Sequence, residues 1–134
     1  YKIHILWERD TMKRLGDEEL EIMLYIWEAG GPVQSTYIHH RMRGSRDWAL
    51  PAVVTAMNRL VEKGFLSCEK RGRSNWYSPL VDEGEYKAAE GRGMIDRLYG
   101  SSFTGMVASL YDGRAIGEDD LAELRRYLDE LEGK

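Results

Sequence analysis

The chain has 134 residues, of which 43% are hydrophobic and 31% charged, and a formal net charge of −4 at pH 7. Such values are typical of a globular protein with one core of ordinary size, or of a small domain with an appendage. No apolar run approaches the ~18 residues of a membrane span, so direct membrane binding is not expected. The single cysteine, Cys68, excludes an internal disulfide, and the N-terminal apolar stretch is too short for a signal peptide. The sequence therefore predicts a cytoplasmic protein.

The charge is distributed unevenly along the chain. Residues 12–81 carry 10 Lys and Arg against 8 Asp and Glu, whereas residues 82–134 carry 7 against 13. A basic first part and an acidic second part fit a protein in which one half contacts nucleic acid and the other half faces something else. An excess of two positive charges is a weak indication alone, so the pattern of elements has to support it.

The first predicted helix lies within "GDEELEIMLYIWEAGGP", residues 16–32. Residues 1–11 precede it without joining any periodic pattern, and they are interpreted as a leader or extension, with an added edge strand as the alternative. The acidic residues at 17–19 suit the positive end of the helix dipole, and the Gly-Gly-Pro run ends the helix. The apolar residues that fall at helical spacing, and so form the predicted inward face, are Leu20, Met23, Leu24 and Trp27.

Two more helices are predicted before the pattern changes. Residues 33–44 form a short helix with Ile38 and Met42 inward, and residues 49–63 form a longer one. Pro51 falls in the first turn of the longer helix, where its missing N–H leaves no helical hydrogen bond unmade. Gly64 closes this third helix.

After the third helix the period of the apolar residues changes from 3.6 to 2. "FLSCEK" and "NWYSPL" are strand-like, and "RGRS", with Gly72 at its centre, is the turn that joins them. Three helices followed by a two-stranded β-hairpin are the elements of a winged helix-turn-helix. We therefore predict a mainly α fold with a winged-helix DNA-binding domain at residues 12–81.

Residues 82–134 are predicted to be helical again, in three segments. The middle segment, residues 101–113, carries too many large apolar side chains for the surface of a monomer. The last segment has leucines spaced 3, 4 and 3, as in a coiled-coil seam of fewer than two heptads. We interpret the region as a C-terminal helical dimerisation arm. Its predicted interface consists of Phe103, Met106, Val107, Leu110, Leu121, Leu124, Leu128 and Leu131.

The third helix has the two faces of a helix that reads DNA. At about 100° per residue, Val53, Ala56, Met57, Leu60 and Val61 gather on an apolar side, opposite a face that is mostly polar and small. A helix in a major groove needs such an outer face, and apolar side chains can contact thymine methyl groups. A plain solvated face is the alternative. The predicted base-reading residues are Leu50, Pro51, Ala52, Thr55, Asn58 and Arg59.

Phosphate contacts are predicted on both sides of this helix. Basic and hydroxyl residues occur in the turn before it and at the tip of the hairpin, where a wing would lie beside a reading helix. The alternative is a solvated, charged loop. The predicted phosphate-contacting residues are Arg43, Ser45, Arg46, Lys70, Arg71 and Arg73.

The sequence predicts no catalytic site, metal site or cofactor. His39 and His40 are adjacent, so on a helix they point about 100° apart and cannot form an i,i+4 metal-binding pair. There is no nucleophile with a plausible base and no phosphate-binding glycine loop. An enzymatic function is therefore not predicted.

Together, these segments resemble the penicillinase-repressor family, the BlaI/MecI/CopY group of bacterial transcription repressors. The resemblance is carried by "LGDEELEIMLYIW", "VVTAMNRLVEKGFL", "RGRSNWYSPL", "MIDRLYGSSFTGMVASLYDG" and "EDDLAELRRYLDEL", and it extends from about Lys13 to Leu131. It implies a homodimer that binds a palindromic double-stranded DNA operator and blocks transcription of β-lactamase or other resistance genes.

The sequence departs from the family pattern at two places. Family members usually carry hydroxyl or basic residues at the start of the recognition helix, where this chain has Leu50, Pro51 and Ala52. The β-lactam-responsive members look to be released by cleavage at an Asn-Phe pair in the fifth helix. Here that pair aligns with Ser109 and Leu110, so cleavage by the same kind of membrane-anchored sensor protease does not follow directly.

Two other functions stay open at the level of sequence. The apolar first turn of the third helix also suits a winged-helix module that binds protein and not DNA. Alternatively, Gly91, Gly93 and Gly105 could leave room for a small ligand in the arm. The sequence does not separate such a pocket from close helix packing.

Overall fold

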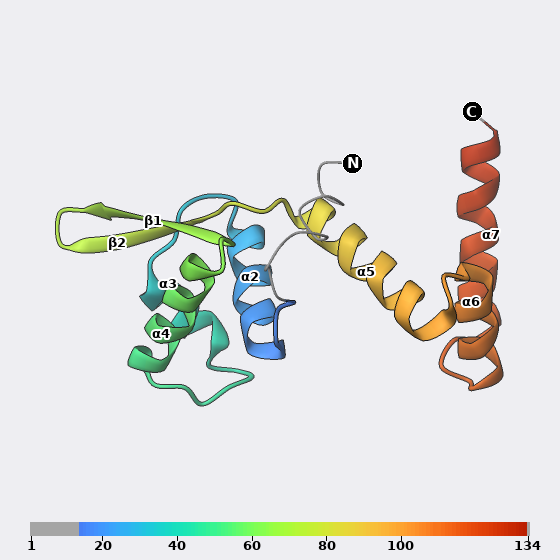
Figure 1. Ribbon diagram of the computed structural model, residues 1–134, viewed down its shortest axis with the longest axis horizontal. Coiled ribbons are helices and arrows are strands. Elements are labelled where there is room, and N and C mark those ends of the chain that lie inside the picture. Colours follow the sequence, from blue (N-terminus) through green and yellow to red (C-terminus); the bar gives the residue numbers. More distant parts are fainter. Residues whose placement is uncertain (1–13, 134) are drawn as a thin grey trace. The chain divides into compact units, whose positions relative to one another are not determined.

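The computed structural model describes residues 14–133, so the interpretation of residues 1–11 lies outside the described residues. The described elements follow the predicted order of three helices, a hairpin and three further helices, which confirms the mainly α winged-helix fold (Figure 1). They are α2 (Asp17–Ala29), α3 (Ser35–Met42), α4 (Leu50–Glu62), β1 (Leu66–Arg71), β2 (Ser74–Pro79), α5 (Glu83–Tyr99), α6 (Phe103–Asp112) and α7 (Glu118–Glu132).

The chain divides along its sequence into two compact units, the first ending at Glu90 and the second beginning at Gly91. We call residues 14–90 the winged unit and residues 91–133 the arm. The division falls inside α5 and not ahead of it, where the sequence placed the boundary between residues 81 and 82. The physical reason is Tyr86 in the first half of α5, which is 2% exposed and whose ring lies 5.8 Å from the rings of both Trp27 and Phe65.

A single hydrophobic core holds the winged unit together. Ile38 and Met42 of α3 are buried in it, as predicted, but the buried face of α2 differs from the prediction. Ile22, Met23 and Ile26 are buried, whereas Leu24 is 38% exposed. The prediction overlooked a charged stripe of Asp17, Glu21 and Glu28, which share one side of the helix at about 100° per residue. Leu24 lies next to this stripe, and the buried residues lie on the opposite side, which contacts α3, α4 and β2. The core consists of Ile22, Met23, Ile26, Val33, Ile38, Met42, Val53, Ala56, Met57, Leu60, Phe65, Leu66, Tyr77 and Tyr86.

The wing is the antiparallel hairpin of β1 and β2, which projects from the three helices (Figure 1). Its register pairs Leu66 with Pro79 at the base and Arg71 with Ser74 at the tip. Gly72 in the turn has φ of +64°, a conformation that glycine adopts without steric cost. At the base, Val33 and Tyr77 exchange two backbone hydrogen bonds of 2.9 and 2.8 Å, which anchor the wing to the segment between α2 and α3.

The arm is organised differently from the winged unit. Extensive contacts between elements are confined to α2, α3, α4, β1 and β2, and α6 and α7 share no comparable contact. Among the described residues 91–133, no side chain is buried. α6 does begin at a well-formed cap, in which the Gly105 N–H donates to the Ser102 hydroxyl at 2.8 Å. The arm thus has regular helices but lacks a core of its own within one copy of the chain.

Candidate nucleic-acid interface

α4 has an inner and an outer face, as the sequence predicted. Val53, Ala56, Met57 and Leu60 are buried in the core, while Val61, predicted to join them, is only half-buried. Every candidate base-reading residue except the half-buried Leu50 is exposed. The exposed set comprises Pro51, Ala52, Thr55, Asn58 and Arg59.

The position of Asn58 on this face is fixed from the wing. The Tyr77 hydroxyl donates a hydrogen bond of 3.0 Å to Asn58 Oδ1, although the two residues are 19 positions apart. Burial raises the pKa of Tyr77, so its hydroxyl stays protonated and keeps its role as donor. The carboxamide of Asn58 therefore has one defined orientation, with its NH₂ group available to an external acceptor.

The connection between α3 and α4, residues 43–49, is held at two points. At one end, Arg46 Nε donates to Glu21 Oε1 at 2.8 Å, and the Ser45 hydroxyl donates to Glu21 Oε2. At the other end, His39 Nε2 lies 2.8 Å from the Trp48 carbonyl oxygen. Two of the predicted phosphate contacts, Ser45 and Arg46, are thus engaged by an acidic residue of α2.

The electrostatics of Glu21 follow from these contacts. Burial by itself would raise the pKa of Glu21, but the hydrogen bonds from Ser45, Arg46 and Tyr25 outweigh it and lower the pKa below its ordinary value. Glu21 is therefore a carboxylate at neutral pH. It binds the connection in its charged form.

In the wing, the three predicted phosphate contacts differ in their surroundings. Arg71 is paired with Glu69 at 3.0 Å, and its guanidinium lies 5.3 Å from the centre of the Trp76 ring. Lys70 and Arg73 are exposed, as is Arg43 beyond the end of α3, and none of these three forms an ion pair with another described residue. They are the cations most readily available to a phosphate.

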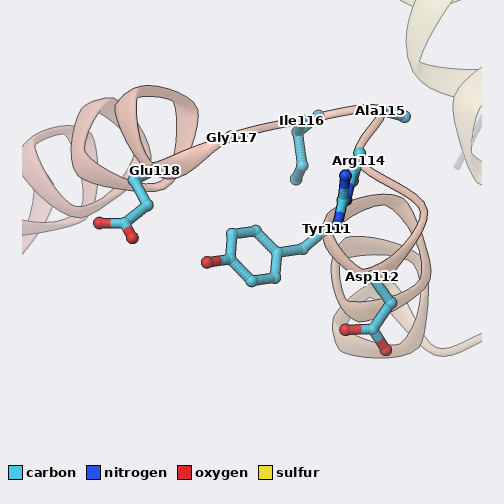
Figure 2. A pocket seen from close by; sticks show the side chains of 7 residues that line it. All are labelled: Tyr111, Asp112, Arg114, Ala115, Ile116, Gly117 and Glu118. Carbon is cyan, nitrogen blue, oxygen red and sulfur yellow. The ribbon is translucent and has the colours of Figure 1, made fainter.

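The arm contains a solvent-open hollow of about 550 Å³ where α6 and α7 are joined. Figure 2 shows Tyr111 and Ile116 pointing into it, with Arg114 at its edge. None of the glycines that suggested a ligand pocket lines it. A Cβ on Gly105 would lie 3.0 Å from the Ser102 hydroxyl, so that glycine makes room for the cap of α6.

Residues 14–133 contain neither a cluster of metal-ligand side chains nor a membrane-spanning helix. No group of three or more His, Cys, Asp or Glu side chains in residues 14–133 is arranged to hold a metal ion. In the same residues, no helix combines the length and apolar character that crossing a membrane requires.

A profile of the penicillinase repressor family matches residues 15–130. The chain belongs to this family. It is 26% identical to the penicillinase repressor of Bacillus licheniformis, over 87% of this chain and 91% of that protein, and 29% identical to the transcriptional regulator BlaI of Mycobacterium tuberculosis, over 90% and 87%. A solved structure, the DNA-binding domain of the repressor BlaI, is similar with a TM-score of 0.50 at 29% identity, covering 57% of this chain and 92% of that one. The resemblance seen in the sequence is confirmed.

For this member of the penicillinase repressor family, the structure adds two residues that sequence reasoning missed. Tyr77 orients Asn58, and Glu21 holds Ser45 and Arg46. Glu21 follows the acidic residues 17–19 that suit the helix dipole, but it lies beyond the first turn of α2. No local spacing relates it to a serine 24 positions away, so only the fold reveals the contact.

Proposed function

We propose that this protein is a cytoplasmic transcriptional repressor that binds a pseudo-palindromic operator as a homodimer and regulates β-lactamase or other resistance genes without catalysis. The observation that carries the proposal is the exposed outer face of α4 in a chain of this family. This face lies between the α3–α4 connection and a wing in which Lys70 and Arg73 form no ion pair with another residue of 14–133. An exposed helix flanked by phosphate-binding groups is the geometry of major-groove recognition.

The outer face of α4 supplies the base contacts in this proposal. Thr55 and Arg59 donate to base edges or phosphates, and Asn58 uses its fixed carboxamide toward adenine. Leu50, Pro51 and Ala52 give the first turn an apolar surface that suits thymine methyl groups. The operator should therefore place A·T pairs opposite the first turn of α4.

Phosphate binding divides into two classes. Arg43, Lys70 and Arg73 are free to neutralise phosphates at once, whereas Arg46 and Arg71 would first have to leave Glu21 and Glu69. With three to five cations per protomer, a dimer neutralises about 6 to 10 phosphates. The slope of log K against log salt concentration is then between about −5 and −9.

The homodimer is supported by the arm. Its exposed apolar side chains include Leu98, Phe103, Leu128 and Leu131, and no residue of its described part is buried. A folded unit without a buried core needs a partner to cover its apolar surface. A second copy of the arm meets that need and sets two winged units on successive half-sites.

Release by proteolysis at the bond between Ser109 and Leu110 is part of the proposal. The bond lies inside α6, where the Ser109 carbonyl accepts a hydrogen bond from the Gly113 N–H at 3.0 Å. A membrane-anchored sensor protease could cleave it only after α6 unwinds locally. Exposure of Ser109 on a helix that is not buried makes such unwinding inexpensive.

The test is binding to the protein's own promoter fragment, compared with random DNA, at several salt concentrations. A protected two-fold site and a steep salt slope are the expected result. Leu124→Lys in α7 should weaken operator binding while leaving the melting of the winged unit unchanged. Unchanged operator affinity in this variant would contradict the dimeric arrangement.

A protein-binding winged-helix module is the second candidate. It is favoured by one observation, the exposed Pro51 and Ala52 in the first turn of α4, where a polar surface suits DNA better. Equal and weak binding to the promoter fragment and to random DNA would favour this module. A small-ligand repressor that uses the hollow at Tyr111 and Ile116 would instead show operator binding that a ligand weakens.

A further inference from the structure

The direction of α4 depends on the connection that precedes it. Residues 43–49, which follow the end of α3 at Met42, contain no helix or strand. The N-cap of α4, Ala49, has no side-chain hydrogen bond. A loop of this kind holds its shape only through contacts with its surroundings. The contacts that tie the loop to the fold include the one from His39 to the Trp48 carbonyl, the packing of Trp48 against the core, and those from Ser45 and Arg46 to Glu21. The backbone N–H groups of Ser45 and Arg46 also donate to the Met42 carbonyl at the end of α3.

Glu21 uses both carboxylate oxygens in its contacts. Oε1 accepts from Arg46 Nε at 2.8 Å, while Oε2 accepts from the Ser45 hydroxyl and from Tyr25, whose hydroxyl is 3.1 Å away. Its side chain is 18% exposed, so water competes little for these bonds. Glu18 adds a weaker contact, 3.7 Å from Arg46. The buried core fixes α2, and Glu21 transmits that fixed position to the loop.

We propose that Glu21 is a positioning residue for operator recognition, because it holds the connection, and with it the first turn of α4, in the arrangement that reads the operator. The inference rests on the proposed function. Glu21 itself does not contact DNA in this account; it acts through Ser45, Arg46 and the backbone that leads into Leu50 and Pro51.

Whether DNA affinity rises or falls when the charge of Glu21 is removed distinguishes a positioning role from a purely electrostatic one. A carboxylate beside a DNA-binding surface repels phosphate, and it also keeps Arg46 from binding one. If these were its only effects, removing its charge would strengthen binding to every DNA sequence. Positioning predicts the opposite for the operator alone, because a displaced first turn loses base contacts while phosphate contacts remain.

The experiment compares the full chain with its Glu21→Gln variant on operator and random DNA. Glu28→Gln is the matched control, since Glu28 is on the same helix, pairs with Arg41 at 2.7 Å and makes no described contact with the connection. Both variants remove one negative charge from α2. The expected result is a loss of about 10-fold in operator affinity for Glu21→Gln, the size of one lost base contact, with random DNA bound as well or better.

Three outcomes would overturn the inference. They are an equal gain in affinity for operator and random DNA, unchanged affinity for both, or the same loss of operator affinity in Glu28→Gln. Failure of the unaltered chain to prefer its operator would instead refute the proposed function, so the two ideas fail separately.

A second variant keeps the inference testable if Glu21→Gln melts below the assay temperature. Ser45→Ala removes one partner of the same carboxylate and leaves Arg46 in place. It should reduce the ratio of operator to random binding, because the loop loses one of its hydrogen bonds to α2. An unchanged ratio of operator to random binding in Ser45→Ala would overturn the positioning role.

Discussion

Leu128 offers a quantitative test of the dimeric arm. It is 45% exposed in one copy of the chain, and it lies on the leucine seam of α7. Burying a whole leucine side chain contributes about 1.5–3 kcal/mol, so burying the exposed half contributes about 1 kcal/mol. A two-fold interface contains the residue twice. Leu128→Ala should therefore cost about 2 kcal/mol of dimerisation free energy, or roughly 30-fold in the dimer dissociation constant.

Sedimentation equilibrium over a dilution series measures that constant directly. Leu80→Ala is the matched control, because Leu80 is 61% exposed but belongs to the winged unit, outside the arm. Its substitution should leave the dimer dissociation constant unchanged. A shift of less than about threefold for Leu128→Ala, or equal shifts for both variants, would refute the reasoning that the exposed seam is buried against a second copy.

Three further predictions concern the winged unit. Tyr77→Phe should lower the free energy of unfolding by only about 1 kcal/mol, because the exposed Asn58 can form a hydrogen bond with water instead. It should nevertheless weaken the discrimination between bases at one operator position, which binding to single-base operator variants measures. Glu19→Gln should cost about 1–3 kcal/mol in thermal or urea unfolding, because Lys63, 2.7 Å away and partly buried, loses its carboxylate partner; Glu19→Met with Lys63→Met should recover part of the loss. The pKa of Glu21 lies below its ordinary value of 4.5, so the folded state binds fewer protons and stability rises with pH. The stability advantage over Glu21→Gln should accordingly be complete above pH 4.5 and shrink as the pH falls below it; an advantage that is constant from pH 3 to 7 would contradict this linkage.

Local rules explain why the elements could be placed from the sequence. The Gly-Gly-Pro run ends α2, Pro51 begins α4, and the change of period at Phe65 marks the wing, each through the conformational preferences of a few neighbouring residues. The two faces of α4 followed from its residue spacing for the same reason. The family resemblance rested on the order of these same segments, and the family profile confirms it.

Pairing and boundaries depended on contacts between distant residues, whereas the rotation of α2 could have been read from the sequence. Leu24 lies beside the charged side of α2, and Ile22 and Ile26, on the opposite side, are buried. The predicted division before α5 could not foresee that Tyr86 packs beside Trp27 and Phe65. Likewise, nothing near Glu21 in the sequence indicates Ser45 and Arg46 as its partners.

The sequence by itself determined the helices, the wing, the buried and exposed faces of α4 and the apolar surface of the arm, because each depends on a short-range period or on a single turn residue. Tertiary structure decided which polar side chains are free and which are held. Arg43, Lys70 and Arg73 have no ion-pair partner within residues 14–133, while Arg46, Arg71 and Asn58 have partners within the fold. The physical reason is that a hydrogen bond or ion pair depends on distance in space, and the core that sets those distances joins residues far apart along the chain.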